Sequence, residues 1–405
     1  MDENKIKKIV QSYDTPVYVF DIGVLKKRIQ YLQEHLPKDV ELCYAVKANT
    51  FLIKEINQLL DRFEVCSPGE AYICQGLNIP MEKLVISGVY KTPSFVKELI
   101  MSREKVGLFT VESLQQLKLI KNAASKYNTR VRVLLRITSG NQFGLNESEV
   151  RELIKKRDKM DCIDICGLQY FSGTQKQSLK KLKRELDYLD QLMQALSKDY
   201  GFETRELEFG PGFPVAYFQT EDFDETTFLE EFSNLLNNMS YKTKITLELG
   251  RSIAANCGSY MSKVVDKKTN KRENYAILDG GIHHLVYYGQ SMAMKVPRYQ
   301  IFPDRDETEY KNWNLCGSLC TVNDILVKQL PVCDLKIGDV FVFANTGAYC
   351  MTEGISLFLS RELPQILILD ENEKIISVRE HISTDILNSP NYKEEKEQWK
   401  DLSKY

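Results

Sequence analysis

Tyr44-Ala45-Val46-Lys47-Ala48-Asn49 places one lysine directly after a run of apolar residues. Residues 40–46 are typical of a β-strand, and residues 52–60 have the composition of a helix. In a barrel of parallel strands, reactive side chains lie at the rim where a strand ends and its loop begins. We therefore predict that Lys47 lies at such a rim and that its amine forms an imine with a carbonyl compound. A solvated surface lysine is the alternative that this stretch alone leaves open.

Strand-like and helix-like segments alternate through the chain as far as residue 250. The expected strands are short and rich in β-branched residues, and they span residues 17–20, 41–46, 62–65, 85–86, 106–110, 130–137, 164–170, 206–209 and 244–248. The expected helices span residues 93–101, 112–127, 147–156, 177–200 and 225–238. This alternation predicts a (β/α)8 TIM barrel, a fold that typically takes about 250 residues.

From residue 253 onward the pattern changes, because strand-like segments follow one another without long helices. They span residues 259–265, 274–279, 313–315, 340–343, 365–369 and 374–377. We therefore expect an α/β chain in which a TIM barrel is followed by a C-terminal all-β domain. The expected boundaries are 24–255 for the barrel, 256–386 for the β domain and 387–405 for a tail, with segment 1–23 joining the β domain.

The composition argues against several classes of partner. The chain has 54 Lys and Arg residues against 56 Asp and Glu, a net charge of −2 that attracts neither nucleic acid nor an anionic membrane. Its 405 residues, 43% of them hydrophobic, are enough to bury two cores. No basic segment leads into an apolar one at the N-terminus, and no apolar run approaches a membrane span. We expect a cytoplasmic protein that binds small polar or zwitterionic molecules.

The 10 cysteines are scattered and include no C-x-x-C pair, so neither a disulfide framework nor a metal site is expected. Most of them are therefore interpreted as buried, reduced thiols. Cys320 is the exception because of its surroundings, which read Cys320-Thr321-Val322-Asn323-Asp324.

Two further motifs follow expected strands of the barrel. Gly210-Pro211-Gly212 suits the approach of backbone amides to a phosphate, although a plain turn has the same composition. Glu248 stands three residues before Arg251. The acid can keep a pyridine nitrogen protonated, and the guanidinium suits a phosphate or carboxylate. The alternative for this pair is a structural ion pair at the barrel mouth.

Together, the lysine, the glycine loop and the acid–arginine pair, in this order on a barrel followed by a β domain, resemble the fold type III pyridoxal-phosphate enzymes. The chain is similar to the decarboxylases of ornithine and diaminopimelate, which have the alanine racemase/ornithine decarboxylase-like fold, from residue 15 to about residue 386. Six more motifs match in the family's order: Glu64-Val65-Cys66-Ser67-Pro68-Gly69-Glu70, Gln142-Phe143-Gly144, Ser172-Gly173-Thr174-Gln175, Asp279-Gly280-Gly281, Cys320-Thr321-Val322-Asn323-Asp324 and Gly347-Ala348-Tyr349.

The resemblance implies a role for each of these residues. Lys47 would hold pyridoxal 5'-phosphate through an imine, which the amine of the substrate displaces. Loss of CO2 would leave a carbanion that the protonated cofactor ring delocalises, with Glu248 keeping the ring nitrogen charged. The phosphate would be held by the following residues: Thr174, Gly210, Gly212, Arg251 and Tyr349.

By the same resemblance, Cys320 would be the second catalytic residue, the one that returns a proton after decarboxylation. In the family this cysteine reaches the site from the partner subunit, as does the acid that corresponds to Asp324. The resemblance therefore implies a homodimer with shared active sites.

The sequence also departs from the family. The ornithine and diaminopimelate enzymes place a histidine over the cofactor ring where this chain has Phe171, which can stack but cannot titrate. Diaminopimelate decarboxylases follow the catalytic cysteine with a glutamate, but here Thr321 follows Cys320. They also have an arginine and a tyrosine for the distal carboxylate in the segment where this chain has His283 and His284.

These departures indicate that the groups which recognise a D-amino-acid terminus are missing. The histidine pair, the Ser172-Gly173-Thr174-Gln175 run and the Cys320-Thr321 opening instead resemble the branch that includes the butirosin-pathway decarboxylase, which acts on an aminoacyl group tethered to a carrier protein. Two ordinary loop residues are the alternative for His283 and His284. The substrate-binding residues that we expect are the following: Arg251, His283, His284, Thr321, Asp324 and Tyr349.

The expected function is a pyridoxal-phosphate-dependent α-decarboxylase of an L-amino acid in a biosynthetic pathway. Its substrate would be carrier-bound or uncharged at the distal end. Three alternatives are a diaminopimelate decarboxylase, an amino-acid racemase on the same barrel and a non-catalytic regulator. The racemase usually needs a tyrosine base opposite the lysine, and a regulator would be expected to lose Lys47 or Arg251, both of which are present.

Overall fold

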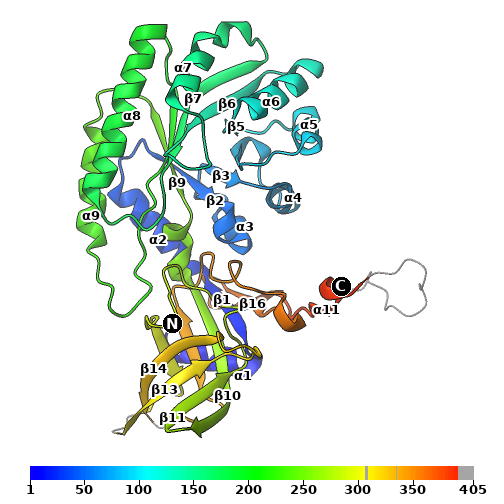
Figure 1. Cartoon of the computed structure of the whole chain (residues 1–405), viewed down its shortest axis with the longest axis vertical. Helices are drawn as coiled ribbons and strands as arrows, with labels where there is room; N and C mark the ends of the chain where they lie inside the picture. The colour runs from blue at the N-terminus through cyan, green and yellow to red at the C-terminus, as the bar shows by residue number, and fades with distance from the viewer. Residues whose placement is uncertain (306–308, 334, 391–405) are drawn as a thin grey trace.

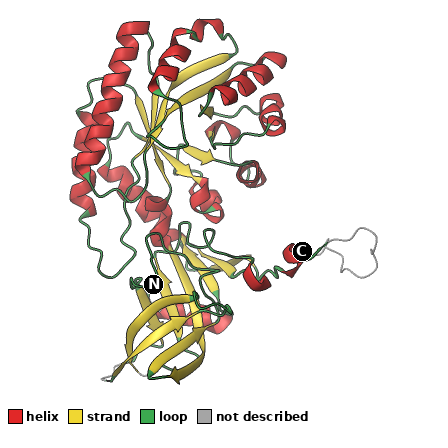
Figure 2. Cartoon of the chain, in the orientation of Figure 1, coloured by secondary structure: helices red, strands yellow, loops and turns green. Residues whose placement is uncertain are grey.

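The structure, a computed structural model, describes residues 1–305, 309–333 and 335–390. A barrel and a large sheet are stacked along the long axis of the molecule, with the barrel at the top of Figure 1. Helices surround the barrel, whereas the part of the molecule that contains the large sheet consists mostly of strands and loops (Figure 2). Most of the predicted tail, residues 391–405, lies outside the described residues.

The barrel is closed by eight parallel strands in the order of the sequence. These are β2 (Glu41–Ala45), β3 (Arg62–Val65), β4 (Leu84–Ile86), β5 (Leu108–Val111), β6 (Val131–Ile137), β7 (Ile163–Phe171), β8 (Glu206–Gly210) and β9 (Lys244–Leu249). Closure is made by β9, which pairs with β2 in a register that sets Glu248 beside Cys43. The predicted (β/α)8 barrel is therefore confirmed.

Helices cover the outside of the barrel. They are α2 (Ile22–His35), α3 (Ile53–Ile56), α4 (Pro68–Gly76), α5 (Pro93–Met101), α6 (Leu114–Lys126), α7 (Glu147–Lys155), α8 (Leu179–Tyr200), α9 (Glu225–Asn237) and α10 (Arg251–Ala254). The helix expected at 52–60 is much shorter than predicted. Asn49 has an extended backbone and its side chain accepts a hydrogen bond from the amide of Phe51, so residues 50–52 form a 3-10 turn before α3 begins.

The second part is a nine-stranded sheet, as expected for an all-β domain. Its strands are β1 (Val17–Asp21), β10 (Gly258–Asn270), β11 (Glu273–Leu278), β12 (Tyr299–Phe302), β13 (Tyr310–Cys316), β14 (Ile325–Cys333), β15 (Val340–Ala344), β16 (Gln365–Leu369) and β17 (Ile375–Arg379). The N-terminal strand β1 lies between β10 and β16. Two short helices, α1 (Glu3–Ser12) and α11 (Asp385–Asn388), flank the chain ends.

Two strands of this sheet were not predicted. β14 contains Pro331 and the polar pair Lys328 and Gln329, and Gln329 has a positive φ of 51°, so its apolar alternation is interrupted. β12 is only four residues long and is partly exposed. β12 pairs with β15, about 40 residues later, and local composition does not report such pairing, whereas β14 pairs with the preceding strand β13.

The barrel and the sheet share one hydrophobic core. The same cluster contains Phe63 and Phe209 of the barrel and Tyr18, Tyr260 and Phe343 of the sheet. The junction between the two parts is therefore packed, and it holds the loops that leave the barrel strands in a fixed position. No helix in the described ranges is long and apolar enough to cross a membrane.

Hydrogen bonds join the loop after β2 to the loop after β15 across this junction. The side-chain amide of Asn49 donates to the carbonyl of Gly347 at 2.9 Å. The backbone amide of Tyr349 donates to the carbonyl of Ala48 at 2.9 Å. The rim of the barrel beside Lys47 is thus in direct contact with the sheet.

Candidate active site at the barrel rim

Lys47 lies in the 3-10 turn Val46–Ala48 that directly follows β2, at the carboxyl end of the strand as predicted. Its Nζ lies 2.6 Å from Oε2 of Glu64, 3.5 Å from Oε1 of Glu248 and 3.6 Å from Sγ of Cys66. Burial lowers the pKa of this amine, but the Glu64 and Glu248 carboxylates outweigh burial and raise the pKa well above its ordinary value. The side chain is still 40% exposed, so a molecule entering the barrel mouth can reach it.

Glu64, on β3, is a site residue that the sequence analysis did not assign. Its carboxylate is buried, yet the Lys47 ammonium and its hydrogen bond overcome the effect of burial and lower the pKa to about 2. The position could have been found, because a glutamate one residue before the end of a barrel strand points toward the same rim as Lys47.

The capped start of α4 holds Cys66 in place. Oγ of Ser67 accepts a hydrogen bond from the amide of Glu70 at 3.2 Å, and Oε2 of Glu70 accepts one from the amide of Cys66 at 2.6 Å. This reciprocal arrangement is similar to a capping box and follows from the local sequence 66–70. It fixes the backbone that carries the thiol next to Lys47.

Glu248 lies on β9 and points into the barrel. Burial and the negative charge of Glu64 raise the pKa of this carboxyl to about 8, so it holds a proton at neutral pH. Its second oxygen, Oε2, accepts a hydrogen bond of 3.3 Å from Nε2 of Gln169. The same Nε2 donates to Oε1 of Glu208 at 2.8 Å. Gln169 and Glu208 were not predicted, although Glu206 and Glu208 alternate on one strand, a pattern that indicates inward carboxylates.

Arg251 begins α10 and is 7% exposed. Its Nη1 donates to the hydroxyl of Tyr217 at 2.7 Å, and its Nε lies 3.4 Å from Oγ1 of Thr174. Its guanidinium carbon lies 4.9 Å from the ring centre of Tyr288 and 4.6 Å from that of Tyr349. Within the described ranges Arg251 makes no ion pair with a carboxylate, so the pair with Glu248 that the spacing left open does not form.

The glycines of the loop after β8 are required by close contacts. A Cβ on Gly210 would lie 2.5 Å from the ring of Phe171, and one on Gly212 would lie 2.1 Å from the carbonyl oxygen of Gly173. Gly212 also has a φ of +63°, which favours glycine. The loop therefore packs directly against residues 171–174, which carry Phe171 and Thr174.

Tyr349 reaches the same place from the sheet. It has a φ of +65°, which is a strained conformation for a tyrosine. The hydrogen bond that its backbone amide donates to the carbonyl of Ala48 holds it there. Its hydroxyl oxygen would lie only 2.7 Å from a Cβ on Gly250, the residue before Arg251. Tyr349, Arg251 and Thr174 are thus brought together from three distant parts of the sequence.

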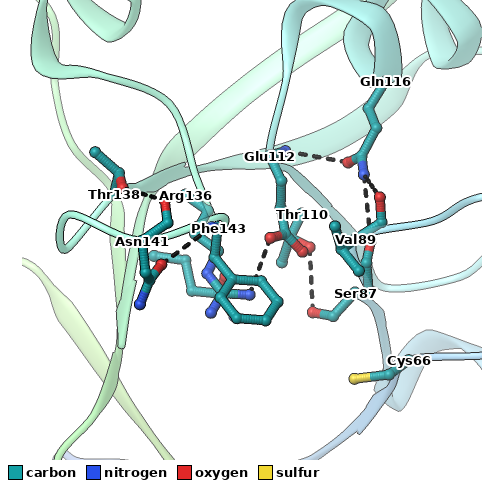
Figure 3. A network of polar contacts seen from close by, with 12 residues as sticks. Cys66, Ser87, Val89, Thr110, Glu112, Gln116, Arg136, Thr138, Asn141 and Phe143 are labelled. Carbon is teal, nitrogen blue, oxygen red and sulfur yellow. Dashed lines mark hydrogen bonds and ion pairs between the residues drawn. The ribbon is translucent and has the colours of Figure 1, made fainter. Parts of the chain in front are cut away.

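A second network of polar contacts lines the rim on strands β3 to β6 (Figure 3). Arg136 pairs with Glu112 at 3.1 Å, and its guanidinium carbon lies 4.7 Å from the ring centre of Phe143. Gln116 accepts a hydrogen bond from the amide of Glu112 at 3.1 Å. Apart from the motif around Phe143, these residues were not singled out in the sequence. They lie at the carboxyl ends of the strands that follow β3, the strand that leads to Cys66.

The residues predicted on the sheet lie apart from this group. Cys320 is exposed in the segment between β13 and β14. Asp324 is buried and accepts hydrogen bonds from the amides of Ile282 at 2.8 Å and Leu319 at 2.7 Å. In the described part of the chain, no hydrogen bond or ion pair joins Cys320, Thr321 or Asp324 to Lys47. Their roles stay predictions.

The two histidines are buried. Nδ1 of His284 lies 3.1 Å from the hydroxyl of Tyr260, and Nε2 lies 2.7 Å from the carbonyl oxygen of Glu362, so both ring nitrogens are occupied. The ring of His283 lies 3.7 Å from that of His284, and neither of its nitrogens has a hydrogen-bond partner within the described ranges. Burial lowers the pKa of His283 to about 4 and that of His284 to about 3. Both rings are therefore neutral at neutral pH.

The residues at the barrel rim fit pyridoxal phosphate. Lys47 offers an amine for the aldehyde, and Glu248 offers a protonated carboxyl for the ring nitrogen. Arg251 is a buried cation without a carboxylate partner in the described residues, which is the property expected of an anion-binding group. With Thr174 and the backbone at Gly212 it would hold the phosphate, while Phe171 and Tyr349 border the same space.

Comparisons with known proteins point the same way. The pattern described as "Pyridoxal-dependent decarboxylase, pyridoxal binding domain" matches residues 22–255. The chain is 25% identical to diaminopimelate decarboxylase of Aquifex aeolicus, over 93% of this chain and 92% of that protein. It is 26% identical to L-glutamyl-[BtrI acyl-carrier protein] decarboxylase of Niallia circulans, covering 92% of each.

Two further comparisons agree. The chain is 26% identical to 2-[(L-alanin-3-ylcarbamoyl)methyl]-2-hydroxybutanedioate decarboxylase of Staphylococcus aureus, over 90% of this chain and 96% of that protein. Diaminopimelate decarboxylase from Helicobacter pylori, solved with L-lysine, has the same fold, with a TM-score of 0.83 at 21% identity over 95% of this chain and 98% of that one. Because the family pattern covers more than half of the 405 residues, the chain belongs to the pyridoxal-dependent decarboxylases and is a pyridoxal-phosphate-dependent carboxy-lyase.

Proposed function

We propose that this enzyme removes the α-carboxyl group of an L-amino acid whose distal end carries no free ammonium–carboxylate pair, such as a carrier-bound thioester or an amide, in a biosynthetic pathway. The observation that carries the catalytic part is the placement of the Lys47 amine between Glu64 and Glu248, at 2.6 and 3.5 Å, on a rim that also contains a buried arginine.

When bound, pyridoxal phosphate supplies the electron sink that accepts the electron pair left by departing CO2. The residues of the chain do the rest. Glu64 holds Nζ of Lys47 in place through an ion pair that favours the charged amine, and this amine must become neutral to act as a nucleophile. Glu248 holds a proton that it can share with the ring nitrogen, and Gln169 orients that carboxyl.

Orientation comes from the opposite end of the site. Arg251, Thr174 and the loop at Gly212 would fix the phosphate. A substrate held at both ends can keep the bond to its carboxyl group perpendicular to the ring, the geometry in which bond breaking is easiest. Phe171 contributes an apolar face and no titrating group.

The specificity part rests on the absence of charge in the motif after Gly281. His283 and His284 are neutral at neutral pH, because burial lowers their pKa to about 4 and about 3. Burying a distal carboxylate or ammonium without an opposite charge costs several kcal/mol. A hydroxyl at Thr321 suits an uncharged distal end. The Niallia relative is named for an aminoacyl carrier protein, a substrate of this kind. The Staphylococcus relative is named for an alanine joined through a carbamoyl group to a hydroxybutanedioate, whose distal part has two carboxylates but no ammonium group, so it also lacks a free ammonium–carboxylate pair.

We also propose that the enzyme is a homodimer in which Cys320 completes the site of the partner subunit. Two observations support this. First, Cys320 is exposed and Val322 is 89% exposed, although the segment 319–324 that contains them is anchored by the buried hydrogen bond from the amide of Leu319 to Asp324. Second, among the described residues, this segment makes no hydrogen bond or ion pair to Lys47 of its own chain. The substrate would then be enclosed by residues of both subunits.

Relative rates on several substrates test this function. We expect kcat/KM for a carrier-bound glutamyl thioester or an amide-bearing amino acid to exceed that for meso-diaminopimelate, glutamate, ornithine and lysine. Lys47→Ala should abolish CO2 release, whereas Lys54→Ala, an exposed lysine nearby, should not. Efficient conversion of meso-diaminopimelate to lysine would favour the diaminopimelate decarboxylase alternative and overturn the proposed specificity.

A further inference from the structure

A chain of three buried side chains crosses the interior of the barrel from β8 through β7 to β9. Nε2 of Gln169 donates to Oε1 of Glu208 at 2.8 Å and to Oε2 of Glu248 at 3.3 Å, so one amide bridges two carboxyl groups. Glu208 and Gln169 are each 1% exposed. Glu248 in turn reaches Lys47 through its other oxygen, Oε1, at 3.5 Å. Glu208 is therefore linked to Glu248 through one intervening side chain, that of Gln169, and to Lys47 through two.

Part of this chain is not satisfied by protein groups. Within the described ranges, Oε2 of Glu208 and Oε1 of Gln169 are buried atoms without a hydrogen-bond partner. A buried, unpaired carboxylate oxygen is costly, and the cost falls when the carboxyl takes up a proton. The geometry around Glu208 thus makes its ionised form costly and favours its protonated form.

The charged and titratable groups around Glu208 do not neutralise it. Those that act on it or share its environment are the following: Glu64 and Arg62 of β3, Glu206 of β8, Glu248 of β9 and Cys43 of β2. Arg62 is bonded to Glu206 at 2.8 Å, and Lys47 is bonded to Glu64 at 2.6 Å. Both nearby cations already have carboxylate partners, so Glu208 and Glu248 share a space with too few positive charges for both to ionise at low cost.

We propose that Glu208 is a titrating positioning residue of the reaction: through the amide of Gln169, its charge sets how firmly the ring nitrogen of the cofactor holds the proton that Glu248 supplies. This proposal rests on the role given to Glu248 above. In the transfer, the O–H bond of Glu248 breaks as the N–H bond at the ring forms, so no further reactant is needed.

The sign of the effect follows from electrostatics. A negative charge on Glu208 favours the protonated form of every nearby group, and hence a protonated ring nitrogen. A neutral Glu208 favours it less. Burial and the charge of Glu64 raise the pKa of Glu208 to about 7, so the switch between the two states falls near neutral pH. The readiness of the ring to accept electrons would then rise as Glu208 ionises.

The first test uses the cofactor-free chain, and therefore does not depend on the proposed function. Infrared difference spectra taken across neutral pH report the carbonyl band of a protonated, buried carboxylic acid. We expect the wild type to lose such a band as the pH rises, and Glu208→Gln to lack that component. The matched control is Glu206→Gln, two residues away on the same strand, which should keep it. A band that is unchanged in Glu208→Gln would overturn the proposal.

The second test follows the ring nitrogen itself, by nuclear magnetic resonance of enzyme loaded with 15N-labelled pyridoxal phosphate. In Glu208→Gln the ring nitrogen should lose its proton about one pH unit lower than in wild type, the size expected for a unit charge several ångströms away at an effective dielectric constant of about 20. Glu206→Gln should show no such shift. An unchanged titration in Glu208→Gln would contradict the proposal.

A second variant keeps the proposal testable if Glu208→Gln folds poorly. Gln169→Met removes the bridging amide and leaves Glu208 in place, so Glu208 should still titrate while its influence on the ring nitrogen falls. If Glu248→Gln also leaves the ring titration unchanged, the role of Glu248 in the proposed function is wrong, and that outcome is distinct from a failure at Glu208 alone.

Discussion

Nζ of Lys47 lies 2.6 Å from Oε2 of Glu64, a carboxylate that is only 2% exposed. This ion pair holds the amine in its charged form, in which it is not a nucleophile. This relationship between neighbouring strands β2 and β3 has direct consequences for cofactor loading.

Glu64→Gln should shift the pH dependence of cofactor loading toward lower pH. Removing the nearest carboxylate removes the largest effect that raises the pKa of Lys47, so more of the amine is neutral at a given pH. The rate at which pyridoxal phosphate is captured, followed by its absorbance, measures this shift. Glu82→Gln, at an exposed position, is the matched control. An identical pH profile in Glu64→Gln and wild type would show that Glu64 does not control the amine.

The cofactor-free chain should lose stability as the pH rises from about 4.3, the ordinary value for a glutamate, toward 8. Burial and like charge raise the pKa of Glu208 to about 7 and that of Glu248 to about 8, so in this window the folded state binds more protons than the unfolded state. The stability that these protons provide is present at low pH and is lost as the pH rises.

Urea unfolding at several pH values measures this effect. Glu208→Gln should flatten the decline, by a few kcal/mol at most because each pKa unit corresponds to about 1.4 kcal/mol. Glu206→Gln should not flatten it, because the hydrogen bond and charge of Arg62 overcome burial and lower the pKa of Glu206. A decline that persists unchanged in Glu208→Gln would show that this carboxyl does not hold a proton in the folded chain.

Gly212→Ala should destabilise the chain more than Gly201→Ala does. Both glycines have a positive φ, +63° and +57°, so both substitutions cost about 1–2 kcal/mol for the left-handed backbone. A Cβ on Gly212 would also lie 2.1 Å from the carbonyl oxygen of Gly173, whereas one on Gly201 meets nothing within 4 Å. The difference between their unfolding free energies isolates the close contact between Gly212 and Gly173 that shapes the loop after β8. Equal losses of unfolding free energy would mean that the loop at Gly212 can move away from Gly173 without an energetic cost.

Mixed subunits test the shared active site. Lys47→Ala and Cys320→Ala should each be inactive, but heterodimers formed after subunit exchange contain one intact site. With equal and complete random mixing, about a quarter of the wild-type activity should return. Mass spectrometry of the mixture verifies the exchange. If heterodimers form and no activity returns, then Cys320 either acts within its own chain or takes no part in the reaction.

The barrel was predictable from sequence because strands and helices alternate with local periodicity that composition reports. β12 was not, since its partner β15 lies far away in the chain, and β14 was not because Pro331 and the positive φ of Gln329 interrupt its apolar alternation. The same division holds for the site. Lys47 and Arg251 stand at strand ends within recognisable motifs, whereas the bridge made by Gln169 depends on which residues of three strands point inward at one level.

The His283–His284 pair is a case in which the sequence suggested a binding role but could not reveal the burial and the hydrogen bonds of the side chains. As sequence, two adjacent histidines near a predicted site suggest binding, but His284 has both nitrogens occupied by Tyr260 and Glu362. Burial, which the local sequence does not reveal, lowers the pKa of both rings. If they line the substrate site, as proposed above, we expect them to act there as neutral groups.

The central claim is that Lys47 carries the cofactor, and Lys91 is the most relevant competitor because it is also buried and burial lowers its pKa to about 8. Borohydride reduction of the loaded enzyme, followed by peptide mass mapping, identifies the lysine directly. We predict that the added mass lies on the peptide containing Lys47, that it is absent from Lys47→Ala, and that Lys91→Ala retains it. Modification of Lys91 or of another lysine, with Lys47 unmodified, would contradict the account.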